Sequence, residues 1–262
     1  MITRRHFVIP DCQVKDDVPL EHLTWCGEYI VKMKPDVVIQ IGDFADMPSL
    51  SSYDAKGSRS YEGKRYKADV KAAKQAMGML LRPLREHQAW TLASHKPRYE
   101  PRLVLTLGNH EDRITRAIEQ DPNHLEGLIS LDDLGYAEAG WEVHPYLKPV
   151  EIDGIVYNHY FPTGQMGHPC GTARSILNKY HMSCFAGHLQ GRDIAYARRA
   201  DGKTITAIIA GSFYQHEEQY LNPITNNHWR GIYVLHEVSE GAFDEMPVSM
   251  NYLRGRYGRG GE

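Results

Sequence analysis

The chain has 262 residues, enough to bury a substantial apolar core in one large domain or in two small ones. Hydrophobic residues make up 42% and charged residues 24%, values typical of globular proteins, which excludes a disordered chain or a fibrous repeat. The formal charge of -3 lacks the basic excess that would by itself indicate a nucleic-acid coat or a membrane-surface protein.

The first half of the chain predicts strands that alternate with helices. Apolar, β-branched runs predict strands over 6–10, 36–43 and 101–108, and helix formers predict helices over 18–34, 67–90 and 113–120. The order β, α, β, α, β, α favours an α/β sheet with helices on its faces. Pro83 inside the second helix could kink it.

The second half is richer in short strands. We expect strands over 155–160, 184–186, 194–198, 204–210 and 232–237, with one helix over 171–180 among them. The pair Asp201-Gly202 between two of these runs predicts a hairpin. The expected architecture is two packed sheets with outer helices. No repeat or low-complexity linker marks a boundary, so we expect a single domain over 1–262.

Cysteine usage and hydropathy indicate the compartment. The four cysteines form no CxxC pair, which predicts reduced, buried thiols rather than a zinc ribbon or a disulfide framework: Cys12, Cys26, Cys170 and Cys184. The apolar stretch 7–10 is too short for a signal peptide, and no segment reaches the length of a membrane span. We expect a cytoplasmic protein with no membrane partner.

Residues able to ligate a cation follow several of the predicted strands: Asp11, Asp43, Asn109, His159 and His188. Each alone has an ordinary structural interpretation, because Asp caps helices, Asn occupies turns and a single His is usually a satisfied interior or surface residue. Their recurrence in one context, an apolar strand followed by a Gly or polar turn, favours a shared site outside the carboxyl ends of the strands.

Four of these segments, taken in order, resemble the calcineurin-like metallophosphoesterase superfamily: Gly42-Asp43, Gly108-Asn109-His110-Glu111, His159 and Gly187-His188. That family has D-x-H, then GD, then GNH with an acidic residue, then a lone H, then GH-x-H. The resemblance spans residues 11–190. It implies a four-layer αββα β-sandwich with flanking helices and a metal-dependent phosphoric ester hydrolase. The variants Asp11-Cys12-Gln13 and Gly187-His188-Leu189-Gln190 are similar to phage or prophage members.

The resemblance also implies a ligand set for two divalent cations. Asp43 would bridge them, and Asn109, His159 and His188 would complete one site whose family ligands are intact. The alternative is a single bound metal.

The other site would take Asp11 and the shared Asp43. Gln13 and Gln190 stand where the family has histidines. Because an amide oxygen is a harder and weaker donor than imidazole, this site should prefer Mn²⁺ or Mg²⁺ over Zn²⁺ and bind its metal less tightly. For the two cations together we expect Mn²⁺, with Mg²⁺, Fe and Zn²⁺ as alternatives.

The chemistry follows from the ions and one histidine. Two cations about 3.5–4 Å apart can bind phosphate oxygens, acidify a bridging water into the attacking hydroxide and offset charge in an in-line displacement. By the family's pattern His110 would be the general acid, protonating the leaving oxygen. Glu111 or Asp112 could orient His110, or could instead be charges that complement the helix N-terminus.

The resemblance implies a phosphate-ester substrate. Two features of the sequence bear on which kind of ester this is. The segment 44–66 carries Tyr53, Tyr61, Tyr66, Arg59, Lys64 and Arg65, which suit a nucleotide or nucleic acid, although an ordinary surface loop has the same composition. We interpret the basic runs 59–74 and 254–259 as solvated faces or tails. His216 or His228 could compensate for the missing histidines, but structural roles are favoured for both.

Three functions from different classes remain open. The first is a hydrolase of phosphodiesters or phosphomonoesters, and the second is a DNA or RNA nuclease of the same superfamily. The third is a binding protein with a relict or mononuclear metal site.

Overall fold

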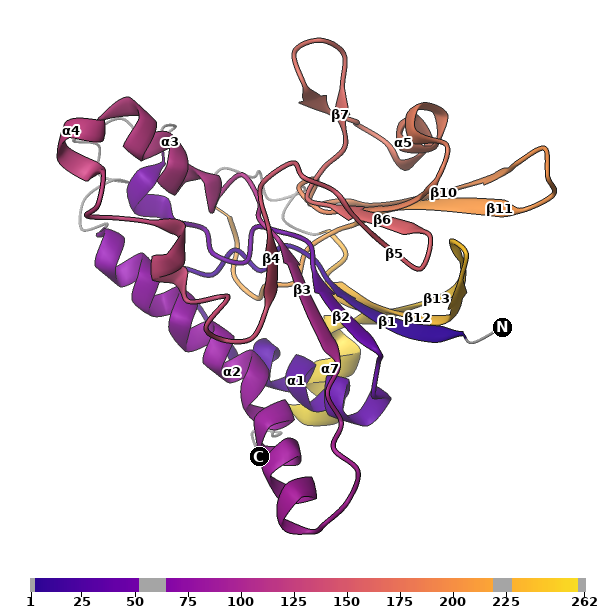
Figure 1. Cartoon of the computed structure of the whole chain (residues 1–262), viewed down its shortest axis with the longest axis horizontal. Coiled ribbons are helices and arrows are strands. Elements are labelled where there is room, and N and C mark those ends of the chain that lie inside the picture. Colours follow the sequence, from indigo (N-terminus) through magenta and orange to yellow (C-terminus); the bar gives the residue numbers. More distant parts are fainter. Residues whose placement is uncertain (1–2, 52–64, 219–227, 259–262) are drawn as a thin grey trace.

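The computed structural model describes residues 3–51, 65–218 and 228–258. In these ranges the protein is a mixed α/β structure with two large sheets, a two-stranded sheet and six α-helices (Figure 1). The predicted α/β class is confirmed at this level.

The larger sheet has six strands in the order β13 (Ala242–Ser249), β12 (Gly231–Ser239), β1 (Arg4–Ile9), β2 (Val37–Gln40), β3 (Arg102–Thr106) and β4 (Glu142–His144). Strands β1 to β4 run parallel, and β12 and β13 add an antiparallel edge. The predicted strands near 6–10, 36–43, 101–108 and 232–237 are confirmed as β1, β2, β3 and β12. Strands β4 and β13 were not predicted.

The second sheet has five strands in the order β10 (Arg192–Arg198), β11 (Thr204–Ala210), β9 (Ser183–Ala186), β6 (Ile155–Asn158) and β5 (Val150–Ile152). The hairpin at Asp201-Gly202 is confirmed between β10 and β11, and Gly202 takes the positive φ of 85° that the turn requires. A separate pair, β7 (Pro162–Thr163) and β8 (His168–Pro169), follows β6.

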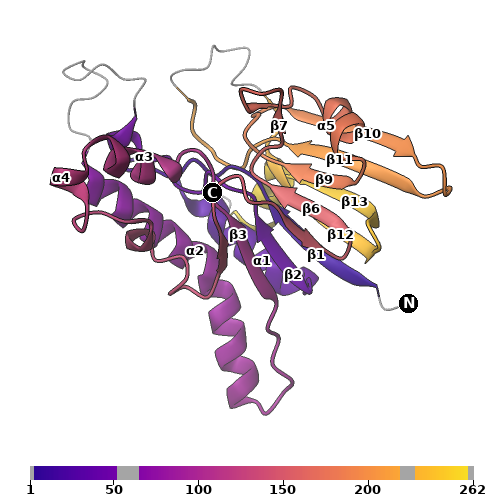
Figure 2. The ribbon, with the colours of Figure 1, turned by 45° about the horizontal axis from the view of Figure 1, so that its top comes forward.

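Helices cover the outer faces of the sheets. The helices α1 (Glu21–Met33), α2 (Tyr66–Ala93) and α7 (Met250–Tyr257) pack on the six-stranded sheet, and α5 (Ala173–Tyr180) packs on the five-stranded one. The short helices α3 (Asp112–Gln120) and α4 (Pro122–Leu125) follow β3, and 3₁₀ turns occupy η1 (Pro48–Leu50) and η2 (Leu131–Leu134). Figure 2 shows α2 and α5 on opposite sides of the molecule.

Apolar side chains form three clusters. One joins the six-stranded sheet to its helices, a second lies between the two sheets, and a third joins the five-stranded sheet to α5. The intersheet cluster pairs Ile39 and Val104 of the larger sheet with Tyr157 and Phe185 of the smaller one. Alternate residues of each parallel strand therefore face the helices and the opposite sheet, which explains why these strands read as continuous apolar runs.

A glycine allows α1 and α2 to pack closely. A β-carbon at Gly27 would lie 2.3 Å from the Leu80 carbonyl oxygen and 3.0 Å from Pro83 Cδ. Pro83 therefore lies inside α2, at its contact with α1, and does not end the helix.

The remaining sequence predictions concern thiols and membranes. All four cysteines are free and buried, as predicted. None of the helices in the described ranges combines the length and the apolar character that crossing a membrane requires.

The intersheet core yields a stability prediction. Ile39 is fully buried in it, so Ile39→Ala should lower the free energy of unfolding by about 2–5 kcal/mol through lost burial and a residual cavity. Leu92→Ala is the matched control because Leu92 is 72% exposed, and it should change stability by less than about 0.5 kcal/mol. Urea unfolding measures both, and equal effects would contradict the packing described.

Candidate metal centre

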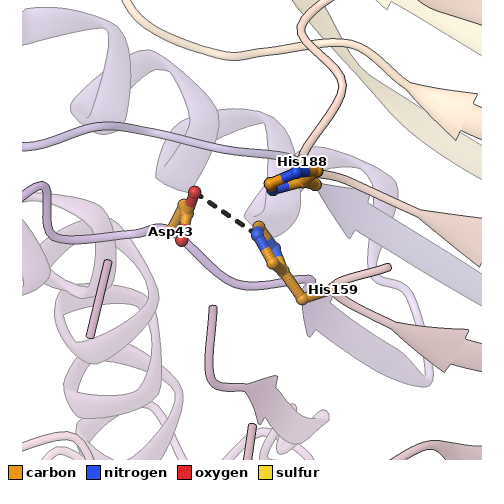
Figure 3. A group of neighbouring side chains, drawn as sticks. All are labelled: Asp43, His159 and His188. Carbon is orange, nitrogen blue, oxygen red and sulfur yellow. Dashed lines mark ion pairs between the residues drawn. The ribbon is translucent and has the colours of Figure 1, made fainter. Parts of the chain in front are cut away.

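Three predicted ligands meet where the two sheets come together. The potential ligand atoms of Asp43, His159 and His188 all lie within 4.8 Å of one another (Figure 3). Asp43 follows β2, His159 follows β6 and His188 follows β9, so two sheets contribute to one cluster. Parallel strands bring their carboxyl ends to one edge, which explains the convergence of residues distant in sequence.

Asn109 joins the same cluster from the turn after β3. Its side-chain oxygen Oδ1 lies 2.9 Å from His159 Nε2 and 2.8 Å from His188 Nδ1. His159 Nε2 also lies 3.3 Å from Asp43 Oδ2. The opposite ring nitrogen, Nδ1, donates to the Ile41 carbonyl oxygen at 2.9 Å, which holds Nε2 toward the cluster.

Asp11 and the two glutamines complete the group. The His188 backbone N–H donates to both carboxylate oxygens of Asp11, at 3.1 and 3.0 Å. Gln190 Nε2 donates to Asp11 at 3.3 Å, and Gln13 Nε2 donates to Asp43 at 3.2 Å. All seven residues predicted as ligands therefore belong to one hydrogen-bonded network.

Glycines explain how the turns approach so closely. A β-carbon at Gly108 would lie 2.1 Å from Asp43 Oδ1, and one at Gly187 would lie 2.3 Å from Asp11 Oδ1. A β-carbon at Gly42 would lie 2.5 Å from the His159 ring. Each glycine thus precedes one predicted ligand and makes room for another. These close approaches explain sterically why glycine precedes the ligand in the Gly-Asp, Gly-Asn and Gly-His pairs of the sequence.

Three of the predicted ligands have left-handed backbone conformations. Gln13, Asp43 and His188 have φ values of 47°, 51° and 65°, in the left-handed region that non-glycine residues rarely adopt. Each such residue costs about 1–3 kcal/mol, so it persists only where the surroundings hold it, often at functional sites.

His110, the predicted general acid, lies beside the cluster and is held by Asp46. Its backbone N–H donates to Asp43 Oδ1 at 2.9 Å, and its ring Nδ1 lies 2.7 Å from Asp46 Oδ1. Its other ring nitrogen, Nε2, lies 3.7 Å from Asp43 Oδ2. The orienting carboxylate is therefore Asp46, and the suggestion of Glu111 or Asp112 was wrong.

Glu111 instead connects the turns that follow β2 and β3. Its fully buried carboxylate accepts backbone N–H groups of Asp43, Ala45 and Gly108 at 2.9–3.0 Å. Asp112, by contrast, is the first residue of α3 and pairs with Arg116 one turn on. Glu111 thus fixes the backbone around the cluster, and Asp112 has the helix N-terminal role that was the alternative.

Two positively charged side chains, those of Lys15 and Arg113, flank Asp46, and neither contact was predicted. Lys15 Nζ lies 2.9 Å from Asp46 Oδ2 and 2.7 Å from a Glu218 oxygen. The Arg113 guanidinium contacts the Asp46 carbonyl oxygen at 2.7 Å and lies 3.3 Å from His110 Nε2. The contacts with Asp46 join residues 31 and 67 apart in sequence and carry no local pattern.

Buried charges set the protonation of the cluster. Burial would raise the pKa of Asp43, but the positive charges of His110 and His159 outweigh it and hold that pKa well below its usual range. Burial would lower the pKa of His159, but Asp43 raises it to about 9. Burial and the charge of His159 lower the pKa of His188 to about 4. The positive charge of protonated His159 thus compensates the negative charge of the Asp43 carboxylate. Binding of a metal cation would release this proton.

The pKa values of Asp11 and His110 are shifted by the same buried charges. Burial, with the nearby Asp43, raises the pKa of Asp11 to about 7. Burial opposes charge on His110, yet Asp43 and the Asp46 hydrogen bond raise its pKa above the usual value. These two interactions favour the protonated form of His110 that a general acid needs, whereas the neighbouring Arg113 guanidinium disfavours it.

Unpartnered buried atoms test whether these residues fit cations. Gln13 Oε1 and Gln190 Oε1 are buried without a hydrogen-bond partner in the described part of the chain. An unsatisfied buried acceptor costs about 1–3 kcal/mol, and a cation beside it would remove that cost. The amide nitrogens, not these oxygens, face Asp43 and Asp11, so each glutamine would turn its amide to offer Oε1 to a cation beside those carboxylates. The donor set of carboxylates, amide oxygens and imidazoles suits Mn²⁺ or a similar ion.

The two histidines considered as substitutes for the missing metal ligands, His216 and His228, have hydrogen-bond partners of their own. His216 Nε2 lies 2.7 Å from Glu218 Oε1, and His228 Nε2 lies 2.6 Å from Ser212 Oγ. These contacts accord with the structural roles favoured for both. In the segment 44–66, the residues Tyr53, Arg59, Tyr61 and Lys64 lie outside the described residues.

Comparisons with known proteins add little. No family model matches the chain, and no curated protein matches it. Among solved structures, it is similar to that of a conserved uncharacterized protein, a predicted phosphoesterase, from Streptococcus pneumoniae TIGR4. The identity is 12%, the match covers 95% of this chain and 99% of that one, and the TM-score is 0.34. We draw no functional inference from a similarity of this degree.

The glycine contacts yield a prediction with an internal control. Gly108→Ala should displace Asp43 and weaken Mn²⁺ binding about 10- to 100-fold, as changes beside a metal ligand commonly do. Gly78→Ala is the control, because a β-carbon there meets nothing within 4 Å on α2, and it should leave Mn²⁺ affinity unchanged while stabilising the helix by about 0.5–1 kcal/mol. Calorimetric titration with Mn²⁺ measures the affinities, and equal values would contradict the steric role of Gly108.

Proposed function

We propose that the protein is a metal-dependent phosphoric ester hydrolase. The observation that carries this proposal is the convergence of Asp43, His159 and His188 within 4.8 Å, with His110 hydrogen-bonded beside them. Metal ligands next to an oriented, protonated histidine are what metal-assisted hydrolysis needs.

The proposal assigns the ligands to two cations that share Asp43. Asn109, His159 and His188 complete one site, and Asp11, Gln13 and Gln190 complete the other. The first set includes two imidazoles, and the second has only oxygen donors. The second site should therefore bind its ion less tightly and prefer Mn²⁺ or Mg²⁺ over Zn²⁺.

The protein's own residues would position the reaction. When bound, divalent cations supply Lewis-acid stabilisation of the phosphate and activation of a water nucleophile. Asp46 accepts a hydrogen bond from the Nδ1–H of His110. The other ring nitrogen, Nε2, would then protonate the departing oxygen. Arg113, 3.3 Å from that nitrogen, adds positive charge where a phosphate oxygen would gain negative charge.

The family assignment is part of the same proposal. The three apolar clusters support a four-layer αββα arrangement of the metallophosphoesterase type. Strands β1, β2, β3, β6 and β9 precede the motif residues in the order in which that family uses them. The glutamine variants are the basis for placing the chain with phage or prophage members.

Separate variants should distinguish metal binding from proton transfer. His188→Ala should abolish metal retention at the first site, whereas His110→Ala should keep the metal and lower kcat about 10²–10⁴-fold for a poor leaving group. The loss should be larger for diphenyl phosphate than for bis(p-nitrophenyl) phosphate, because p-nitrophenolate leaves without protonation. His124→Ala is the control, since the His124 side chain is 79% exposed.

Metal content by mass spectrometry and turnover with added Mn²⁺ measure these effects, and the p-nitrophenyl monoester shows whether monoesters are also cut. Full activity in both the His188 and the His110 variants would refute the assigned roles. Bound metal without turnover of any ester in the unmodified protein would favour a relict or binding site instead.

The weaker site can be tested by restoring a histidine. Gln13→His should tighten Mn²⁺ and Zn²⁺ binding, because imidazole is the stronger donor and His tolerates the left-handed backbone found at this position. Calorimetric titration of the variant and of the unmodified protein measures the change. Unchanged affinity would place the Gln13 side chain away from the cation.

A further inference from the structure

A groove lies between the start of α2 and the segment that follows α4. Its lining is Arg65, Tyr66, Lys67, Val70, Lys71, Lys74, Gln75, Leu128, Ile129 and Asp133. None of these residues belongs to the metal centre.

The groove carries a positive charge. Lys67, Lys71 and Lys74 are exposed on α2, and Arg65 precedes them. Asp133 is the one carboxylate in the lining, and it is held by the Tyr66 hydroxyl at 2.6 Å and the Ser130 N–H at 2.8 Å. Three exposed lysines therefore line the groove with a single carboxylate that already has two hydrogen bonds.

The lysines form a row rather than a random scatter. Lys67, Lys71 and Lys74 are spaced by four and three residues, which places them on one side of the helix. At a rise of about 1.5 Å per residue they extend along about 10 Å of α2. A linear row of ammonium groups suits a linear polyanion better than it suits a single small anion.

The other wall of the groove is apolar and open to solvent. Leu128 is 76% exposed and Ile129 is partly buried, while the partly buried Val70 belongs to the α2 wall. Tyr66, which also lines the groove, adds an aromatic ring, the kind of side chain on which unpaired bases stack while nearby cations contact the backbone.

Both walls are linked to segments that carry residues of the candidate metal centre. From His110 the chain continues through α3 and α4 into the wall at 128–133. The start of α2 is tied to η1, just after Asp46, because the Ser49 N–H donates to Asp69 Oδ2 at 2.9 Å. Figure 1 shows α3, α4 and the start of α2 gathered on one side of the carboxyl ends of β2 and β3.

We propose that this groove binds single-stranded nucleic acid, with backbone phosphates on the lysine row and bases against the apolar wall. The link to catalysis rests on the proposed function, because a nucleic acid strand is itself a polymer of phosphodiesters. An acidic protein segment would satisfy the lysines, but it would not explain a groove next to a phosphoesterase centre. Residues 65–74 of the basic run are then more than a solvated face.

Binding can be measured without turnover. Fluorescence anisotropy of labelled DNA and RNA single strands, with EDTA present, compares Lys67→Gln/Lys71→Gln/Lys74→Gln with Lys32→Gln/Lys148→Gln/Lys179→Gln. The control removes the same charge at exposed lysines outside the groove. The groove variant should bind at least about tenfold more weakly, and its log–log salt dependence should be shallower by about 2, since each lost phosphate contact removes about 0.7. The DNA and RNA arms show which sugar is preferred.

Two results would overturn the proposal: equal affinities of the groove and control variants, or binding of poly-glutamate as tight as that of the strands. Thermal unfolding of both variants checks that they are folded. Hydrolysis of bis(p-nitrophenyl) phosphate with Mn²⁺ should be the same in both, because none of these lysines belongs to the metal centre. Absence of that hydrolysis in the unmodified protein would refute the phosphoesterase proposal but leave the binding result to decide the groove.

Discussion

The Asp43 carboxylate is the contact on which the rest of the site depends. It accepts the His110 backbone N–H, receives the Gln13 amide and lies 3.3 Å from His159 Nε2. So many neighbours can reach one side chain only because Gly108 has no β-carbon. The backbone N–H of Asp43 is in turn held by buried Glu111. The turns that follow the strands therefore determine the positions of the ligands, and the two packed sheets hold these turns in place.

The parts predictable from sequence are those with a local physical cause. Apolar strands buried on both faces read as continuous runs, so β1, β2, β3, β6 and β9 could be found from hydrophobicity. The Gly-Asp, Gly-Asn and Gly-His pairs mark turns in which a missing β-carbon makes room for a neighbouring ligand. Asp11, Asp43, Asn109, His159 and His188 consequently lie together as expected, whereas their binding of cations remains a prediction.

The parts that escaped prediction depend on contacts between distant segments. Asp46 lies in an irregular stretch, and only the folded chain shows that it faces His110 and not the solvent. Lys15 pairs with Asp46, 31 residues away, and with Glu218, 203 residues away, and no periodicity encodes either pairing. Strand β13, the sheet edge beside β12, mixes apolar and acidic residues without regular alternation and contains Pro247, and α7 after it is short. Local propensity was too weak to identify either element.

Anomalous diffraction from a crystal soaked in Mn²⁺ tests the central claim most directly. The account predicts an anomalous peak in contact with Asp43, His159 and His188, and a second, weaker peak toward Asp11, Gln13 and Gln190. The absence of any peak beside Asp43 at saturating Mn²⁺, or these side chains pointing away from one another in the crystal, would contradict it.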